Sequence, residues 1–148
     1  MSQSKRPDPR EVARSVLEIE ADAVRGLVDQ LDEGFDRAVD LLKRTDGRVV
    51  CSGMGKSGII MKKLAATLSS TGTPALFLHP AEAIHGDLGM LAPGDTILAA
   101  SYSGSTAEIL KLVETMKRLG VPLIALTGNA SSPLARSADI HLRVSIDQ

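Results

Sequence analysis

Aromatic residues and cysteine are scarce in this 148-residue chain, and each shortage argues against a class of protein. The chain contains no tryptophan, one tyrosine and two phenylalanines, so it offers almost no stacking platform for nucleic-acid bases or sugar rings. A single cysteine rules out a disulfide framework and a cysteine-based zinc site, and it suits a reducing compartment. We therefore expect a cytoplasmic protein.

Charge of one sign and long apolar runs are missing as well. Lys and Arg total 17 and Asp and Glu total 18, which gives a net charge of −1, so we expect neither nucleic acid nor an anionic membrane as a partner. No apolar run approaches the roughly 18 residues that span a bilayer. Segment 1–10 is polar and lacks the apolar stretch of a signal peptide, and we expect it to form a flexible N-terminus.

The remaining residues, 11–148, have the length of one domain, and from residue 49 onward short apolar runs alternate with helical patterns. The five runs lie at 49–51, 75–78, 96–100, 122–126 and 140–144, and the clearest helical patterns lie at 59–70 and 107–119. Each run is too short for a helix and apolar enough for a strand covered on both faces. The pattern predicts an α/β fold, a parallel sheet with helices on both sides.

Two amphipathic helices are predicted before the first strand. Asp8 can cap a helix that begins at Pro9, and Glu11 occupies the capping-box position. Apolar residues then recur every three or four positions at Val12, Val16, Ile19, Ala23, Leu27 and Leu31. A second helix is predicted over residues 35–42. We expect both helices to pack on the sheet, and because the stripe exceeds what a sheet edge would cover, we also expect a homo-oligomer, a dimer or tetramer.

The first loop that could carry chemistry is Ser52-Gly53-Met54-Gly55-Lys56-Ser57-Gly58, which follows the first predicted strand. It matches G-x-G-x-x-G, but a dinucleotide site also needs an acidic residue at the end of the second strand, where this chain has His79. A P-loop needs glycine at position 50, which is valine. The loop is therefore predicted to hold an anion beside Lys56, the alternative being a tight turn with a solvent-facing lysine.

The second loop is Ser101-Tyr102-Ser103-Gly104-Ser105-Thr106, which runs into a helix containing Glu108. Its four hydroxyls and the free N–H groups of the helix start favour a phosphate cradle built without arginine. The alternative is that Ser105 or Thr106 only caps the helix. Glu108 can owe its place to the helix dipole alone.

The third loop, residues 79–89, holds two of the three histidines. The spacing of His79, Glu82, His85 and Asp87 fits no standard zinc pattern, so metal binding is a minority interpretation. For His79, contact with a sugar and contact with backbone carbonyls are equally supported. The third histidine, His141, and the lone Cys51 lie inside predicted strands, and both are expected to be structural.

Several segments together resemble one family, the sugar isomerase (SIS) domain. They are 53–58, 71–74, 79–83, 85–90 and 101–104, and more narrowly they resemble the arabinose 5-phosphate isomerases. The resemblance implies a three-layer α/β/α sandwich around a five-stranded parallel sheet, of the Rossmann or flavodoxin type. It also implies reversible conversion of arabinose 5-phosphate and ribulose 5-phosphate through an enediol, feeding the Kdo branch of lipopolysaccharide synthesis.

By position, the resemblance assigns roles to individual residues. It implies catalytic roles for Lys56, Glu108 and His85, with no cofactor. The implied substrate contacts are Ser52, Gly53, Gly55, Ser57, Gly72, Thr73, His79, Ser101, Ser103, Ser105 and Thr106. His79 also matches a histidine that takes up inhibitory zinc in relatives.

The resemblance covers only part of the family's length. The chain ends at Gln148, where the family continues into a further glutamate, a further histidine and usually a pair of CBS domains, so residues 11–148 correspond to an SIS domain shortened at its C-terminus. A phosphosugar is the expected partner. The alternative is a non-catalytic phosphosugar sensor of the kind found in transcriptional regulators, which would not need Lys56 or Glu108.

Overall fold

The structure, a computed structural model, describes residues 8–84 and 87–145. The strands are β1 (Val49–Gly53), β2 (Ala75–Phe77), β3 (Thr96–Ala100), β4 (Leu123–Thr127) and β5 (Ile140–Arg143). The helices are α1 (Pro9–Gly26), α2 (Glu33–Lys43), α3 (Gly55–Ser70), α4 (Pro80–Ile84), α5 (Ala107–Leu119) and α6 (Pro133–Ser137), with short 3-10 turns η1 (Val28–Gln30) and η2 (Asp87–Met90). All five predicted strands and the helices at 35–42, 59–70 and 107–119 are therefore confirmed.

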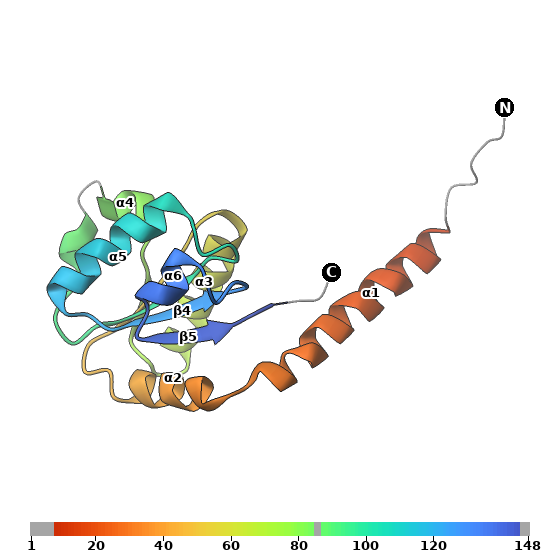
Figure 1. Ribbon diagram of the computed structural model, residues 1–148, viewed down its shortest axis with the longest axis horizontal. Helices are drawn as coiled ribbons and strands as arrows, with labels where there is room; N and C mark the ends of the chain where they lie inside the picture. Colours follow the sequence, from red (N-terminus) through yellow and green to blue (C-terminus); the bar gives the residue numbers. More distant parts are fainter. Residues whose placement is uncertain (1–7, 85–86, 146–148) are drawn as a thin grey trace.

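The five strands form one sheet in the order β2-β1-β3-β4-β5, and every neighbouring pair is parallel. This is the flavodoxin-type order, in which the chain first winds to one side of β1 and then returns to the other. The predicted five-stranded parallel sheet with helices on both faces is thereby confirmed (Figure 1).

The two faces of the sheet are covered by different helices because successive side chains of a strand point to opposite sides. Within β1, Val50 packs into the layer beneath α5, whereas Val49 and Cys51 pack against α2 and α3. The same alternation separates Ile97 from Leu98 in β3. Helices α4, α5 and α6 therefore lie over one face, and α2 and α3 over the other.

Helix α1 begins where the sequence predicts but corrects the expectation about its packing. The side chain of Asp8 caps it by accepting a hydrogen bond from the backbone N–H of Arg10 at 3.0 Å, so the helix begins at Pro9. More importantly, α1 has no buried residue and extends away from the body as an arm (Figure 1). The prediction that both N-terminal helices pack on the sheet is right for α2 and wrong for α1, because α2 and α3 already cover that face.

A side-chain contact joins the base of this arm to the last described residues. The amide of Gln30 donates from Nε2 to the carbonyl oxygen of Ser145 at 2.7 Å, and its Oε1 accepts the backbone N–H of Ser145 at 3.1 Å. The side-chain amide of Gln30 thus pairs with the backbone of Ser145, just after β5, in the way that a neighbouring strand would.

Candidate functional site

The strand order places the candidate site between β1 and β3. Ligands of open parallel sheets bind beyond the carboxyl ends of the strands, at the point where the chain changes direction. Here that point lies between β1 and β3, whose carboxyl ends lead into the Gly53–Gly58 turn and the loop at 101–106.

The turn after β1 is shaped by close packing of its glycines. A Cβ on Gly58 would lie 2.6 Å from the carbonyl oxygen of Gly53, so only glycine lets α3 start this close to the strand. Gly55 adopts a φ of +53°, and Lys56 follows it on the exposed side of α3. Among the described residues, no carboxylate forms an ion pair with Lys56.

Ser52 has a structural role in this turn. Its side chain is fully buried, and its hydroxyl donates to the carbonyl oxygen of Leu78 at 2.8 Å, which ties β1 to the end of β2. The prediction that Ser52 contacts substrate finds no support in this placement.

The serine loop after β3 is held by hydrogen bonds among its own residues. The hydroxyls of Ser101 and Thr106 lie 2.9 Å apart, and the backbone N–H of Gly104 donates to the Ser101 hydroxyl at 3.1 Å. Thr106 is the N-cap residue of α5, but its side chain makes no capping hydrogen bond. Capping of α5 therefore does not explain the presence of Thr106. The hydroxyls of Ser103 and Ser105 are exposed and lie 3.1 Å apart.

Gly104 fixes the position of the serine loop in a way the sequence did not indicate. It has a φ of +63°, and a Cβ there would lie 2.1 Å from the hydroxyl oxygen of Ser132, the N-cap residue of α6. Its carbonyl oxygen accepts the backbone N–H of Leu134 at 3.0 Å. The serine loop thus packs against the start of α6. The sequence did not reveal this contact because α6, with five residues, is too short to show a periodic apolar pattern.

A cavity of about 380 Å³ lies where the two loops meet. Lys56 and Ser57 line it from the first loop, and Ser101 and Tyr102 from the second. Its other walls are apolar and consist of Ile60, Met61, Leu64, Ala100, Leu126 and Val144. The structure therefore brings together Lys56 and the serine loop, as the sequence predicts.

Glu108 does not line this cavity. It lies in the first turn of α5, which covers the face of the sheet opposite to α3. Lys56 and Glu108 thus share the carboxyl edge of the sheet but approach it from opposite faces. His85 lies outside the described residues, and its predicted role stays a prediction.

His79 lies at the same edge, two residues after the last residue of β2. Its backbone carbonyl accepts the N–H of Ala83 at the start of α4, and its ring packs edge-on against Phe77 with centroids 6.3 Å apart. The Nδ1 atom is buried and has no hydrogen-bond partner among the described residues. An unpaired buried nitrogen is costly, which makes this atom a candidate ligand contact.

The other strand residues singled out by the sequence are structural, as expected. Cys51 is fully buried, and burial raises the pKa of its thiol from 9.0 to about 11. His141 pairs through Nε2 with the hydroxyl of Thr127 at 2.9 Å.

Gly72 and Thr73 lie at the amino edge of the sheet, just before β2, whereas Lys56 lies at the carboxyl edge. They end helix α3: the N–H of Thr73 donates to the carbonyl of Leu68 at 2.9 Å, and that of Gly72 donates to Ser69 at 3.3 Å. With Gly72 at a φ of +96°, this is a Schellman motif, in which a left-handed residue satisfies the last helical carbonyls. Their predicted contact with substrate stays a prediction.

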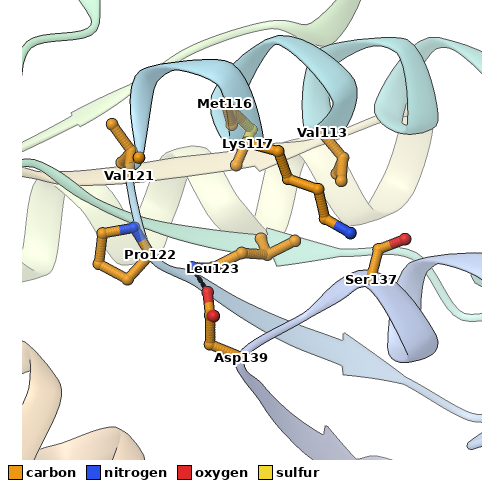
Figure 2. A pocket seen from close by; sticks show the side chains of 9 residues that line it. Val113, Met116, Lys117, Val121, Pro122, Leu123, Ser137 and Asp139 are labelled. Atoms are coloured by element: carbon orange, nitrogen blue, oxygen red, sulfur yellow. Dashed lines mark hydrogen bonds between the residues drawn. The ribbon is translucent and has the colours of Figure 1, made fainter.

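A second cavity, of about 230 Å³, also lies at the amino edge, between α5 and the starts of β4 and β5. Figure 2 shows Lys117 extending across it toward Ser137, and Asp139 below, where its carboxylate accepts the backbone N–H of Leu123 at 2.7 Å. None of the residues predicted for the site lines this cavity.

The described part of the chain contains neither a metal cluster nor a membrane span. Across residues 8–84 and 87–145, no group of three His, Cys, Asp or Glu side chains is placed to hold a metal ion. Within the same ranges, no helix has the length and apolar character needed to cross a bilayer.

Comparison with known proteins assigns the family. The SIS domain pattern matches residues 41–148, nearly three quarters of the chain. The chain belongs to the SIS domain family. This confirms the family resemblance seen in the sequence, and it places both site loops inside the SIS domain.

Two enzymes of similar sequence and one solved structure of similar fold are relatives of this SIS domain. It is 50% identical over 148 residues to arabinose 5-phosphate isomerase KdsD of Pseudomonas aeruginosa and 46% identical over 139 residues to KdsD of Escherichia coli K12. It spans 45% and 42% of their lengths, so it is similar to less than half of each enzyme. A solved structure from Escherichia coli CFT073, in complex with arabinose 5-phosphate, superposes with a TM-score of 0.88 at 39% identity, covering 95% of this chain and 77% of that one.

Proposed function

We propose that this SIS domain is the catalytic part of an arabinose 5-phosphate isomerase, which interconverts arabinose 5-phosphate and ribulose 5-phosphate. The observation that carries the proposal is the cavity at the β1–β3 switch point, where Lys56 meets the serine loop. The identity to the two KdsD enzymes and the likeness to the structure that holds arabinose 5-phosphate support it.

The serine loop would hold the phosphate. Ser103 and Ser105 present exposed hydroxyls, and the N-terminus of α5 adds backbone N–H groups that have no partner within the helix. Gly53, Gly55 and Ser57 of the first loop, together with His79, complete the proposed substrate contacts. The unpaired Nδ1 of His79 supports its inclusion, and inhibitory zinc at the same nitrogen is part of the proposal.

The reaction needs a base and a group that stabilises a developing negative charge. The base removes the proton from C2 of the aldose, the carbonyl oxygen on C1 gains negative charge, and a proton is then delivered to C1 while the hydroxyl proton on C2 moves to that oxygen. We assign the base to Glu108 and charge stabilisation to the ammonium group of Lys56. Glu108 follows Thr106 by two residues, and we propose that a substrate whose phosphate lies on the serine loop meets Lys56 from one face of the sheet and Glu108 from the other. His85 is proposed to assist ring opening.

The setting of the reaction follows from the same resemblance. We propose that the product feeds the Kdo branch of lipopolysaccharide synthesis and that the domain works in the cytoplasm, which its single, buried cysteine suits. We also propose a homo-oligomer, because α1 buries none of its apolar residues within its own chain.

The direct test is to incubate the chain with arabinose 5-phosphate, to measure ribulose 5-phosphate, and to measure binding separately by titration calorimetry. Turnover supports the isomerase. Binding without turnover, retained after Lys56→Ala, would overturn it in favour of the phosphosugar sensor. Absence of both binding and turnover would reject a phosphosugar site in this chain.

A further inference from the structure

Two long helices of this chain expose apolar side chains that no described residue covers. On α1, Leu17 is 66% exposed and Ile19 is 65% exposed. On α3, Ile59 is 71% exposed and Ile60 is 63% exposed. Because α1 extends away from the body, it does not cover α3 of its own chain (Figure 1).

The two helices carry opposite charge. Helix α1 with its cap Asp8 has five carboxylates against three arginines. Helix α3 has three lysines, at positions 56, 62 and 63, and no acidic residue. Their lengths also match, since 18 and 16 residues at about 1.5 Å per residue give helices of about 27 and 24 Å.

One carboxylate of α1 lies inside its apolar surface. Residues three and four positions apart are neighbours on a helix, and for Glu20 these neighbours are Val16, Leu17, Ala23 and Val24. For Glu18 they include Arg14, Ser15 and Asp22, so Glu18 belongs to the polar side of the helix. Glu20 is therefore the carboxylate that points toward whatever covers the apolar side.

Lys63 of α3 occupies the matching position. Its preceding neighbours are the exposed Ile59 and Ile60, four and three residues before it. Lys56 neighbours the same two residues but lines the candidate cavity, and Lys62 neighbours only Ile59. The apolar surface of α3 thus contains a single type of charge, opposite in sign to the charge within the apolar surface of α1.

We infer that α1 of one copy packs along α3 of a second copy, with Glu20 of one chain facing Lys63 of the other. A two-fold axis makes the arrangement reciprocal, so each copy gives its arm and receives the partner's. The inference rests on the homo-oligomer proposed above and specifies its interface. Because α3 begins next to Lys56 and Ile60 lines the candidate cavity, the partner's α1 forms an outer wall of the site.

Charge reversal tests this interface. We expect Glu20→Lys and Lys63→Glu each to raise the dissociation constant of the oligomer roughly tenfold or more, measured by sedimentation velocity over a concentration series. The double variant, which restores opposite charges, should return to within about threefold of the parent. Glu18→Lys makes the same charge change on the polar side of α1 and should leave the constant unchanged. Circular dichroism checks that each variant is folded.

Three outcomes would overturn the inference, and they are distinguishable. A parent chain that is monomeric at micromolar concentration rejects the oligomer itself, while the isomerase assay still reports on the proposed reaction. An oligomer that both single variants leave intact places the interface elsewhere. Single variants that weaken the oligomer without recovery in the double variant reject the pairing of Glu20 with Lys63.

Discussion

The carboxylate of Asp95 is buried against the guanidinium of Arg48, with Oδ2 and Nη2 3.1 Å apart. The same carboxylate accepts the backbone N–H of Arg48 at 2.8 Å and that of Ala92 at 3.0 Å. Burial acts to raise the pKa of Asp95, but the two backbone hydrogen bonds and the Arg48 charge outweigh it, and the pKa falls below its usual 3.8. Asp95 therefore fastens the turn before β3 to the start of β1.

We expect Asp95→Asn to lower the free energy of unfolding by about 2 kcal/mol at pH 7, because an amide cannot accept all three hydrogen bonds. The carboxylate stabilises the fold above its unfolded pKa of about 3.8, and this contribution is lost as the pH falls through the lower folded value. Urea unfolding at pH 7 and pH 3 should therefore show a difference between variant and parent that shrinks at pH 3. An equal difference at both pH values would contradict the ionic role.

Gly104→Ala should destabilise the domain by more than about 2 kcal/mol, because a Cβ at this position collides with Ser132 and the φ of +63° disfavours alanine. Thermal unfolding measures the loss. Gly26→Ala is the matched control, since a Cβ there meets nothing within 4 Å and Gly26 has no positive φ. Comparable melting temperatures for the two variants would mean that the serine loop is not seated against α6.

Removing hydroxyls from the serine loop should weaken binding of arabinose 5-phosphate. Ser103→Ala and Thr106→Ala should each cost about 1–3 kcal/mol, the range for a hydrogen bond to a charged group, as measured by titration calorimetry. Ser70→Ala, at the far end of α3, should bind like the parent. Unchanged affinity in both loop variants would remove the phosphate from this loop.

Lys56→Ala and Glu108→Gln should each lower kcat by about two to four orders of magnitude if these residues act in charge stabilisation and proton transfer. Lys62→Ala on α3 and Glu114→Gln on α5 are the matched controls, since each removes an exposed charge from the same helix and should retain full activity. A loss confined to KM would instead assign Lys56 or Glu108 to substrate binding alone.

The Cys51 thiol should be inert in the native protein. It is fully buried and its pKa is raised to about 11, so a thiol reagent at pH 8 should react only when the chain unfolds. The unfolded thiol ionises near pH 9 while the folded thiol keeps its proton, so this group lowers stability as the pH rises from 9 to 11. Fast labelling of the native chain, followed spectroscopically, would show that β1 is accessible.

The fold was largely predictable because its signals are local. The apolar runs at 49–51 and 96–100 predicted the two strands β1 and β3, and α5 ends at Leu119, the last residue of the predicted helical pattern, with Gly120 at a φ of +66° after it. Helices α4 and α6 have five residues each, too few for a periodic apolar pattern, and both were missed. The packing of α1 was misjudged because an apolar stripe does not identify the surface that covers it.

The candidate site was predictable where it depends on strand ends. Lys56 and Ser101 follow adjacent parallel strands, so their convergence could be inferred. Glu108 and Lys56 lie on opposite faces because α5 and α3 cover opposite faces of the sheet. The strand order decides which face each helix covers, and no local sequence pattern predicts that order. The role of Gly72 at the end of α3 was not predicted, because a glycine that ends a helix and a glycine that approaches a ligand look alike in sequence.

The contact between Gln30 and Ser145 brings two distant parts of the sequence together. Residue 30, at the end of η1, and residue 145, just after β5, lie within hydrogen-bonding distance of each other. A short linker from Ser145 to Gln30 could therefore replace the present connectivity, and new termini could be opened in a surface turn without unthreading the sheet. For protein engineering, such a rearranged domain without α1 would separate the fold of the body from the interface that α1 is inferred to form.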